Sequence, residues 1–232
     1  MDKTAIRHAA TVIMVRDAAT NPRILMGQRG AKAAFMPNKF VFPGGAVDAG
    51  DGEIQLASNM ARKCIARLCH ETDPDLVPAL AVAAIREVWE ETGLILGQSG
   101  RWPATVPPDW AGFAKSGYLP SAAGLRFVFR AITPPGRPRR FDARFFMVDA
   151  GRLCGDLDDF GHACDELSHL QWIALDDVRH FDLPFITEVV MAEVSRLIRN
   201  GQTSDRVPFF RNDDEESLFL QLGAAVIRPQ TG

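Results

Sequence analysis

The chain has 232 residues, of which 47% are hydrophobic and 24% are charged, and its formal net charge at pH 7 is -3. These values are typical of an ordinary soluble globular protein, long enough for one large domain or two small ones. The nearly neutral charge balance gives no reason to expect nucleic acid or a membrane as a partner, and no run approaches the roughly 18 apolar residues of a membrane span.

The amino-terminal segment predicts the start of a strand. It lacks the apolar core and the small-residue cleavage site of a signal peptide. The four cysteines, Cys64, Cys69, Cys154 and Cys164, have spacings that match no reliable zinc pattern. We therefore expect reduced, partly buried thiols in a cytoplasmic protein.

Short apolar and β-branched runs, separated by turn-forming residues, predict the strands of the chain. Residues 11–17 and 23–29 flank the breaking sequence ATNPR, so we expect them to form a hairpin. The strand KFVF at 39–42 follows and ends in the turn sequence PGG. Three later strands are expected at 124–136, 140–150 and 167–175.

Three segments carry apolar side chains at helical spacing. Residues 52–72 predict one amphipathic helix, and residues 81–96 predict a second, which Gly93 would cap. Residues 184–200 predict a third helix, stopped by an Asn-Gly pair. Loops are expected at 97–113 and, as a solvated acidic turn, at 212–217. Because strands and helices alternate without a repeat or linker, the pattern favours one mixed α/β domain over residues 1–232.

The helix expected at 81–96 crowds three carboxylates, Glu87, Glu90 and Glu91, into about one turn. Like charges at this spacing repel by roughly 0.2–0.5 kcal/mol per pair, and negative charge near a helix C-terminus costs about 0.3–1 kcal/mol per group. Arg86 can offset part of this cost by pairing with Glu90. Either the helix tolerates a solvated acidic face, or a hard divalent cation such as Mg²⁺ lies among the carboxylates.

The sequence before this helix decides between the two interpretations. A strand ending in FVFPGG, followed by an acidic helix with REVWEETGL, resembles the signature of the Nudix hydrolase family. That signature reads Gly, five residues, Glu, seven residues, then Arg-Glu-aliphatic-any-Glu-Glu-any-Gly-aliphatic. Gly45 matches its first glycine, and its second half is matched at every fixed position by Arg86, Glu87, Val88, Glu90, Glu91, Gly93 and Leu94.

Two features depart from the family pattern. Asp51 stands six residues after Gly45, where the family usually has Glu, and Glu53 competes with Asp51 for that position. Asp51 and Arg86 are also separated by about 27 residues more than the family spacing. The signature is therefore interrupted by a predicted helical insertion at about 52–79.

An interrupted signature resembles one branch of the family, that of the mammalian peroxisomal coenzyme A diphosphatase. The sequences FMPNKFVFPGG at 35–45 and RRFDARFF at 139–146 are similar to those that flank the signature in that branch. The resemblance implies the Nudix fold, an α/β/α sandwich with a mixed sheet between helices, and a helix at about 184–200 packed at its edge.

The resemblance also implies a metal-dependent hydrolase that cleaves a diphosphate linked to another moiety, with Mg²⁺ or Mn²⁺ as cofactor. Arg86 would orient the glutamates. The general base would be Glu166, on a later loop, or Glu90. The metal ligands that the resemblance implies are Glu87, Glu90, Glu91 and the carbonyl of Gly45.

Four arginines are candidates for substrate binding: Arg29, Arg139, Arg140 and Arg144. Arg29 is similar to an arginine of the coenzyme A-type signature, whose second arginine is absent here. The other three lie around a predicted turn, where their guanidinium groups suit phosphate oxygens. A solvated turn, or an ion pair with Asp142, explains this cluster equally well.

Coenzyme A or an acyl-CoA is the leading expected substrate, followed by NADH, ADP-ribose and nucleotide sugars. A Nudix-fold module that senses a nucleotide without cleaving it is an alternative of a different class. It is disfavoured because the three helix carboxylates and Arg86 are all intact. An interaction domain without any ligand is a third alternative. The expected partner is thus a small-molecule diphosphate, and homodimerisation is left open.

Overall fold

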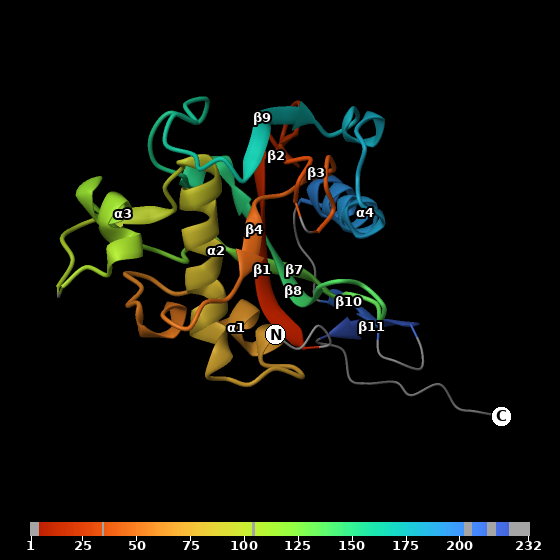
Figure 1. Ribbon diagram of the computed structural model, residues 1–232, viewed down its shortest axis with the longest axis horizontal. Helices are drawn as coiled ribbons and strands as arrows, with labels where there is room; N and C mark the ends of the chain where they lie inside the picture. The colour runs from red at the N-terminus through yellow and green to blue at the C-terminus, as the bar shows by residue number, and fades with distance from the viewer. Residues whose placement is uncertain (1–4, 34, 104, 202–205, 213–216, 223–232) are drawn as a thin grey trace.

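The computed structural model describes residues 5–33, 35–103, 105–201, 206–212 and 217–222. Within these residues, the main sheet has nine strands, seven of them in the order β11-β10-β7-β8-β1-β2-β3, with β4 paired to β1 and β9 to β2. The sheet is mixed, because β1 runs parallel to β8 whereas β7 and β8 are antiparallel (Figure 1). Its strands are β1 Ile6–Arg16, β2 Arg23–Arg29, β3 Phe40–Val41, β4 Gly44–Ala46, β7 Arg126–Ile132, β8 Arg140–Asp149, β9 Leu167–Ala174, β10 Val207–Asn212 and β11 Ser217–Leu222.

Two long helices, α2 (Leu76–Thr92) and α4 (Phe185–Arg199), cover opposite faces of this sheet (Figure 1). Two shorter helices, α1 (Arg62–Leu68) and α3 (Ala111–Lys115), lie on the α2 side. A second, two-stranded sheet pairs β5 (Gly97–Ser99) with β6 (Tyr118–Pro120). This mixed sheet between helical layers is the sandwich that the sequence predicts. None of the described helices is both long and apolar enough to cross a lipid bilayer.

The central strand β1 shows how the sequence produces two cores. Successive side chains of a strand point to opposite faces of the sheet. Accordingly, Val12 and Met14 pack into the core beneath α2, whereas Ile13 and Val15 pack into the core beneath α4. These four side chains are at most 1% exposed, so β1 is apolar on both faces and forms the middle layer of the sandwich.

The predicted helix at 81–96 is confirmed, and it begins earlier, at Leu76. Gly93 ends it with φ of 74°, in the left-handed region that favours glycine, and the Gly93 N–H donates to the Trp89 carbonyl. The hairpin of β1 and β2 is also confirmed, as are the strands β7, β8 and β9 and the helix α4.

The helix predicted over 52–72 is wrong in its extent. Only Asp51–Glu53, as a 3₁₀ turn, and Arg62–Leu68 are helical. Between them the backbone pairs with another segment, because the Ala57 N–H donates to the Pro120 carbonyl and the Ala122 N–H donates to the Ser58 carbonyl. This tertiary pairing overrides the local helical pattern.

The loop predicted at 97–113 contains regular structure, namely β5, a 3₁₀ turn at Pro108–Trp110 and the start of α3. Trp110 and Phe113 are buried in the core beneath α2, which explains why this Pro- and Gly-rich segment is ordered. In the acidic turn predicted at 212–217, residues 213–216 lie outside the described residues.

Candidate functional site

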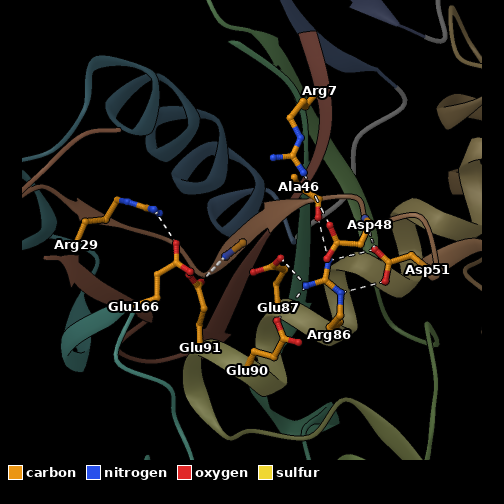
Figure 2. A network of polar contacts seen from close by, with 11 residues as sticks. Arg7, Arg29, Ala46, Asp48, Asp51, Arg86, Glu87, Glu90, Glu91 and Glu166 are labelled. Atoms are coloured by element: carbon orange, nitrogen blue, oxygen red, sulfur yellow. Dashed lines mark hydrogen bonds and ion pairs between the residues drawn. The ribbon is translucent and has the colours of Figure 1, made fainter. Parts of the chain in front are cut away.

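The candidate site lies where the last turns of α2 meet the glycine-rich strand β4 (Figure 2). The Gly44 N–H donates to Oε2 of Glu91 at 2.7 Å, and β4 is held in place by its pairing with β1. A Cβ atom at Gly45 would lie 2.4 Å from Oε1 of Glu87, too close for any side chain unless the carboxylate moves. Glycine is therefore required at position 45 for this contact.

Arg86 is buried and forms hydrogen bonds with several acidic residues (Figure 2). Its guanidinium donates to both oxygens of Asp51, with Nε at 3.0 Å from Oδ1 and Nη2 at 3.1 Å from Oδ2, and Nη2 also donates to the Ala46 carbonyl at 2.9 Å. Its Nη1 donates to Glu87 at 2.9 Å and to Glu90 at 3.0 Å. Arg86 thus contacts two of the three helix carboxylates.

The same contacts distinguish Asp51 from Glu53, the two candidates for the first acidic position of the signature. Asp51 is 2% exposed, forms the two-oxygen contact with Arg86 and accepts from the Asp48 N–H at 2.8 Å. Glu53 is exposed. Of the two acids, Asp51 is therefore the one that contacts Arg86, although 35 positions separate them in the sequence.

The glutamates of α2 lie in an environment that disfavours their charge. Desolvation by burial is the largest cause and raises the pKa of Glu87 to about 7. Burial, followed by repulsion from Glu87, raises the pKa of Glu91 well above its usual range. The Oε1 atom of Glu91 is buried and has no hydrogen-bond partner among the described residues. Burial also raises the pKa of Glu90, which is half-buried.

These properties fit a divalent cation. Arg86 is shared among Asp51, Glu87 and Glu90, and the buried carboxylates would be further stabilised by a hard cation, which prefers oxygen ligands. The partnerless oxygen of Glu91 would gain a ligand bond, and Glu87 lies beside it. Within the described part of the chain, no three His, Cys, Asp or Glu side chains already surround one point. As the structure stands, Glu87 and Glu90 point to Arg86 instead.

Two further predicted site residues lie together on the other side of Glu91 (Figure 2). Arg29, at the end of β2, donates from Nη2 to Oε1 of Glu166 at 2.7 Å. Glu166 precedes β9, has a side chain 53% exposed, and contributes to the raised pKa of both Glu87 and Glu91. The structure thus places the candidate base Glu166 at the mouth of the carboxylate cluster, held by Arg29.

The candidate arginines Arg140 and Arg144 lie away from this cluster. Arg144 is 1% exposed, forms an ion pair with Asp142 at 2.9 Å and donates to Thr72 Oγ1 at 3.0 Å. Arg140 is buried and donates to the Thr133 carbonyl at 3.1 Å. Both cations serve the packing of the sheet, so these positions argue against the predicted contact with substrate.

A pocket of about 800 Å³ opens beside the carboxylates and extends along the α4 face of the sheet. Its lining includes Gly44, Gly45, Glu87, Glu166 and Arg29 at one end. The predicted substrate residue Arg139 also lines it, as do Lys39 and Arg137, whereas Arg140 and Arg144 do not. Sequence patterns missed most of the apolar lining, because it comes from strands and loops that meet only in the folded chain.

Comparisons with known proteins give two informative relatives, although no protein-family model matches the chain. A Caenorhabditis elegans protein, provisionally named nudix hydrolase 7, is 29% identical over 178 residues, which are 72% of this chain and 51% of that protein. The chain thus spans about half the length of this curated relative. The crystal structure of a NUDIX hydrolase from Alicyclobacillus acidocaldarius is 29% identical, with a TM-score of 0.61, over 84% of this chain and 96% of that one.

The structural similarity thus takes in most of this chain and nearly all of the Alicyclobacillus chain. Neither relative's name specifies a substrate. The glycine-rich turn, the carboxylate helix and the fold together with these relatives support the Nudix hydrolase family for this chain.

Proposed function

We propose that the chain is a metal-dependent hydrolase that cleaves the diphosphate bond of a nucleoside diphosphate linked to another moiety. One observation carries this proposal: the buried carboxylates Glu87 and Glu91 lie under the Gly44–Gly45 turn, Glu91 has an oxygen without a partner among the described residues, and Glu87 lines one end of a large pocket. Such a site suits a cation and a phosphate chain, and it suits an apolar or neutral ligand poorly.

Glu87 and Glu91 would hold Mg²⁺ or Mn²⁺, with Glu90 and the Gly45 carbonyl as further proposed ligands. When bound, the metal would supply charge neutralisation for the diphosphate. Arg86 stays buried behind Glu87 and Glu90, so it acts as a positioning residue. Because phosphoryl transfer depends chiefly on alignment and charge, the fixed geometry of this cluster is the contribution of the protein.

Coenzyme A or an acyl-CoA remains the leading substrate within this proposal, with NADH, ADP-ribose and nucleotide sugars as alternatives. Support comes from the resemblance of 35–45 and 139–146 to the coenzyme A branch and from Arg29 and Arg139, which line the pocket. A guanidinium can bind phosphate oxygens through two N–H groups. The nucleotide-sensing module is less well supported, because the acidic cluster is complete.

The test is release of a phosphate monoester from CoA, acetyl-CoA, NADH, ADP-ribose and a nucleotide sugar, with Mg²⁺, with Mn²⁺ and with excess EDTA. We expect metal-dependent turnover of at least one compound. The compound with the fastest turnover would identify the branch of the family. Binding of metal and nucleotide without turnover of any compound would instead favour the sensing module.

We expect Glu166→Gln to lower kcat by about 10²- to 10⁴-fold, as is typical for loss of a general base. Glu90→Gln is the matched comparison, because Glu90 already accepts a hydrogen bond from Arg86. Thermal shift with Mn²⁺ should be nearly unchanged in Glu166→Gln, since this side chain is not a proposed ligand. A larger loss of kcat in Glu90→Gln, with metal binding retained, would transfer the role of base to Glu90.

Gly45→Ala is expected to lower metal affinity and activity by about 10- to 100-fold, the usual effect of disturbing the support of a metal ligand. The new Cβ would displace the carboxylate of Glu87, a flexible group, so the protein should still fold. Gly52→Ala is the control, because a Cβ there meets no atom within 4 Å. Mn²⁺ titration followed by melting temperature measures both variants, and equal midpoints would contradict the proposed role of Glu87.

A further inference from the structure

The candidate base Glu166 ends a loop, residues 153–166, that packs onto the protein before β9 begins. Leu157 and Phe160 of this loop pack against the core beneath α2. The indole N–H of Trp172, on β9, donates to the Leu157 carbonyl at 2.8 Å. We call this segment the base loop. Because its middle is held in this way, the position of Glu166 depends on what holds the last residues of the loop.

The last turn of α2 holds the end of the base loop. The Cys164 N–H donates at 2.7 Å to the carbonyl of Glu90, one of the final carbonyls of a helix that have no partner within the helix itself. Three residues further on, Leu167 begins β9 and pairs with β2. The ion pair between Glu166 and Arg29 adds little, because the Glu166 side chain is 53% exposed (Figure 2). Glu166 is therefore placed by two backbone attachments, one on the helix of the proposed metal ligands and one on the sheet.

Trp89, in the same turn of α2, contacts the base loop through its ring. The Trp89 and His162 rings are stacked, with centroids 6.1 Å apart and planes inclined by 24°. Phe113, in α3, contacts the Trp89 ring edge to face at a centroid distance of 5.8 Å. A Cβ atom at Gly112 would lie 3.2 Å from the Trp89 ring, so this glycine allows α3 to approach closely. Trp89 thus connects three segments, namely its own helix, α3 and the base loop.

Gly93, at the end of α2, leaves room for the same contact. A Cβ atom at this position would lie 3.0 Å from the Cβ of His162, closer than side chains ordinarily approach one another. The left-handed φ of 74° also favours glycine here. This glycine of the signature therefore ends the helix and also admits the base loop against it.

We infer that Trp89 is a positioning residue for the proposed general base: by stacking on His162, it keeps the end of the base loop on α2 and so fixes where Glu166 lies. This inference rests on the proposed function, in which Glu166 takes a proton from the attacking water. A base must lie within hydrogen-bond reach of that water, and a displacement of about 1 Å can lower the rate by about 10²-fold. The family signature leaves position 89 open to any residue, so the signature does not predict this role.

Two truncations test this positioning, Trp89→Ala on the helix and His162→Ala on the loop. Steady-state rates with Mn²⁺ are measured for CoA, acetyl-CoA, NADH, ADP-ribose and a nucleotide sugar. We expect each truncation to lower kcat by about tenfold, less than Glu166→Gln does, because the base is displaced but still present. KM and the midpoint of the Mn²⁺ titration should remain those of the wild type. Trp89→Phe should keep the wild-type kcat, since a phenyl ring can still stack on His162.

Trp102→Ala is the matched control for Trp89→Ala. Trp102 is also half-buried against the core beneath α2, but it contacts Trp110 and donates to the Tyr118 carbonyl. This variant should lower the melting temperature without lowering kcat. An equal kcat in Trp89→Ala and Trp102→Ala would overturn the inference. A loss of Mn²⁺ affinity that accompanies the loss of kcat in Trp89→Ala would overturn it as well, because Trp89 would then act through the metal ligands.

If no compound is turned over, the proposed function fails, and hydrogen exchange tests the docking of the base loop separately. Mass spectrometry of the metal-free protein follows the peptide that contains the Cys164 amide, which the Glu90 carbonyl protects. Loss of the ring contact should speed exchange of this peptide by about fivefold in Trp89→Ala and His162→Ala, but not in Trp102→Ala. Faster exchange in both variants would support the docking by Trp89, and wild-type exchange in both would overturn it.

Discussion

Replacing Glu91 by Gln should abolish the metal-dependent diphosphatase activity, with a fall in kcat of at least about 10²- to 10³-fold. Glu91 is 1% exposed, and its Oε1 atom has no hydrogen-bond partner among the described residues, so this oxygen is free to bind a metal. The Gly44 N–H can still donate to the amide oxygen, which should preserve the local backbone. Stopped assays with Mg²⁺ and Mn²⁺ measure the loss, and Glu188→Gln, an exposed acid on α4, is the control.

The same variant should make the metal-free protein more stable. Burial raises the pKa of Glu91, so the folded state holds its proton more tightly than the unfolded state does. Stability of the metal-free wild type therefore falls as pH rises from the ordinary carboxyl pKa toward the raised folded value. Glutamine cannot ionise, so near pH 8 Glu91→Gln should gain about 1–3 kcal/mol in the free energy of unfolding.

Urea denaturation in EDTA at pH 5 and pH 8 measures this difference, and the gain should be larger at pH 8. With saturating Mn²⁺ the order should reverse, because only the wild type is stabilised by the bound ion. A metal-free Glu91→Gln protein that is less stable than the wild type at pH 8 would show that the protein itself stabilises the charge of Glu91, contrary to its assignment as a metal ligand.

Local sequence patterns predicted correctly the elements whose structure depends mainly on neighbouring residues. The period of α2, the left-handed Gly93 at its end and the extended, apolar run of β1 all follow from neighbouring residues. The predicted helix at 52–72 failed where pairing with a distant segment, at Pro120 and Ala122, outweighed helical spacing. Elements that depend on distant partners were the ones that sequence patterns misjudged.

The same distinction between local and distant determinants applies to the residues of the candidate site. The carboxylates lie on a single helix, so their proximity could be predicted from spacing alone. The positions of Arg139, Arg140 and Arg144 could not be predicted in this way, because whether an arginine side chain faces a pocket or a buried acid depends on packing. Only the structure shows that Arg144 is enclosed with Asp142.

Arg86→Gln should destabilise the protein by about 3–5 kcal/mol, the usual consequence of removing one partner from a buried ion pair. The variant would leave Asp51 without its two guanidinium hydrogen bonds, and Glu87 and Glu90 would lose the cation between them. Because the proposed ligand Glu87 is no longer oriented, Mn²⁺ affinity should fall by about 10- to 100-fold as well. Arg86→Lys should restore little, since an ammonium group cannot form the same two-oxygen contact.

Asp51→Asn and Glu53→Gln then form a matched pair that tests which acid supports the arginine. Asp51→Asn should destabilise the protein by about 1–3 kcal/mol, because it weakens a charge-assisted contact, whereas exposed Glu53→Gln should change stability by less than about 0.5 kcal/mol. The effects of Asp51→Asn and Arg86→Gln should not add in the double variant, since each removes the same contact. Equal urea midpoints for Asp51→Asn and Glu53→Gln would show that Asp51 stabilises the protein no more than exposed Glu53 does. That result would contradict the assignment of Asp51 as the acid that supports Arg86.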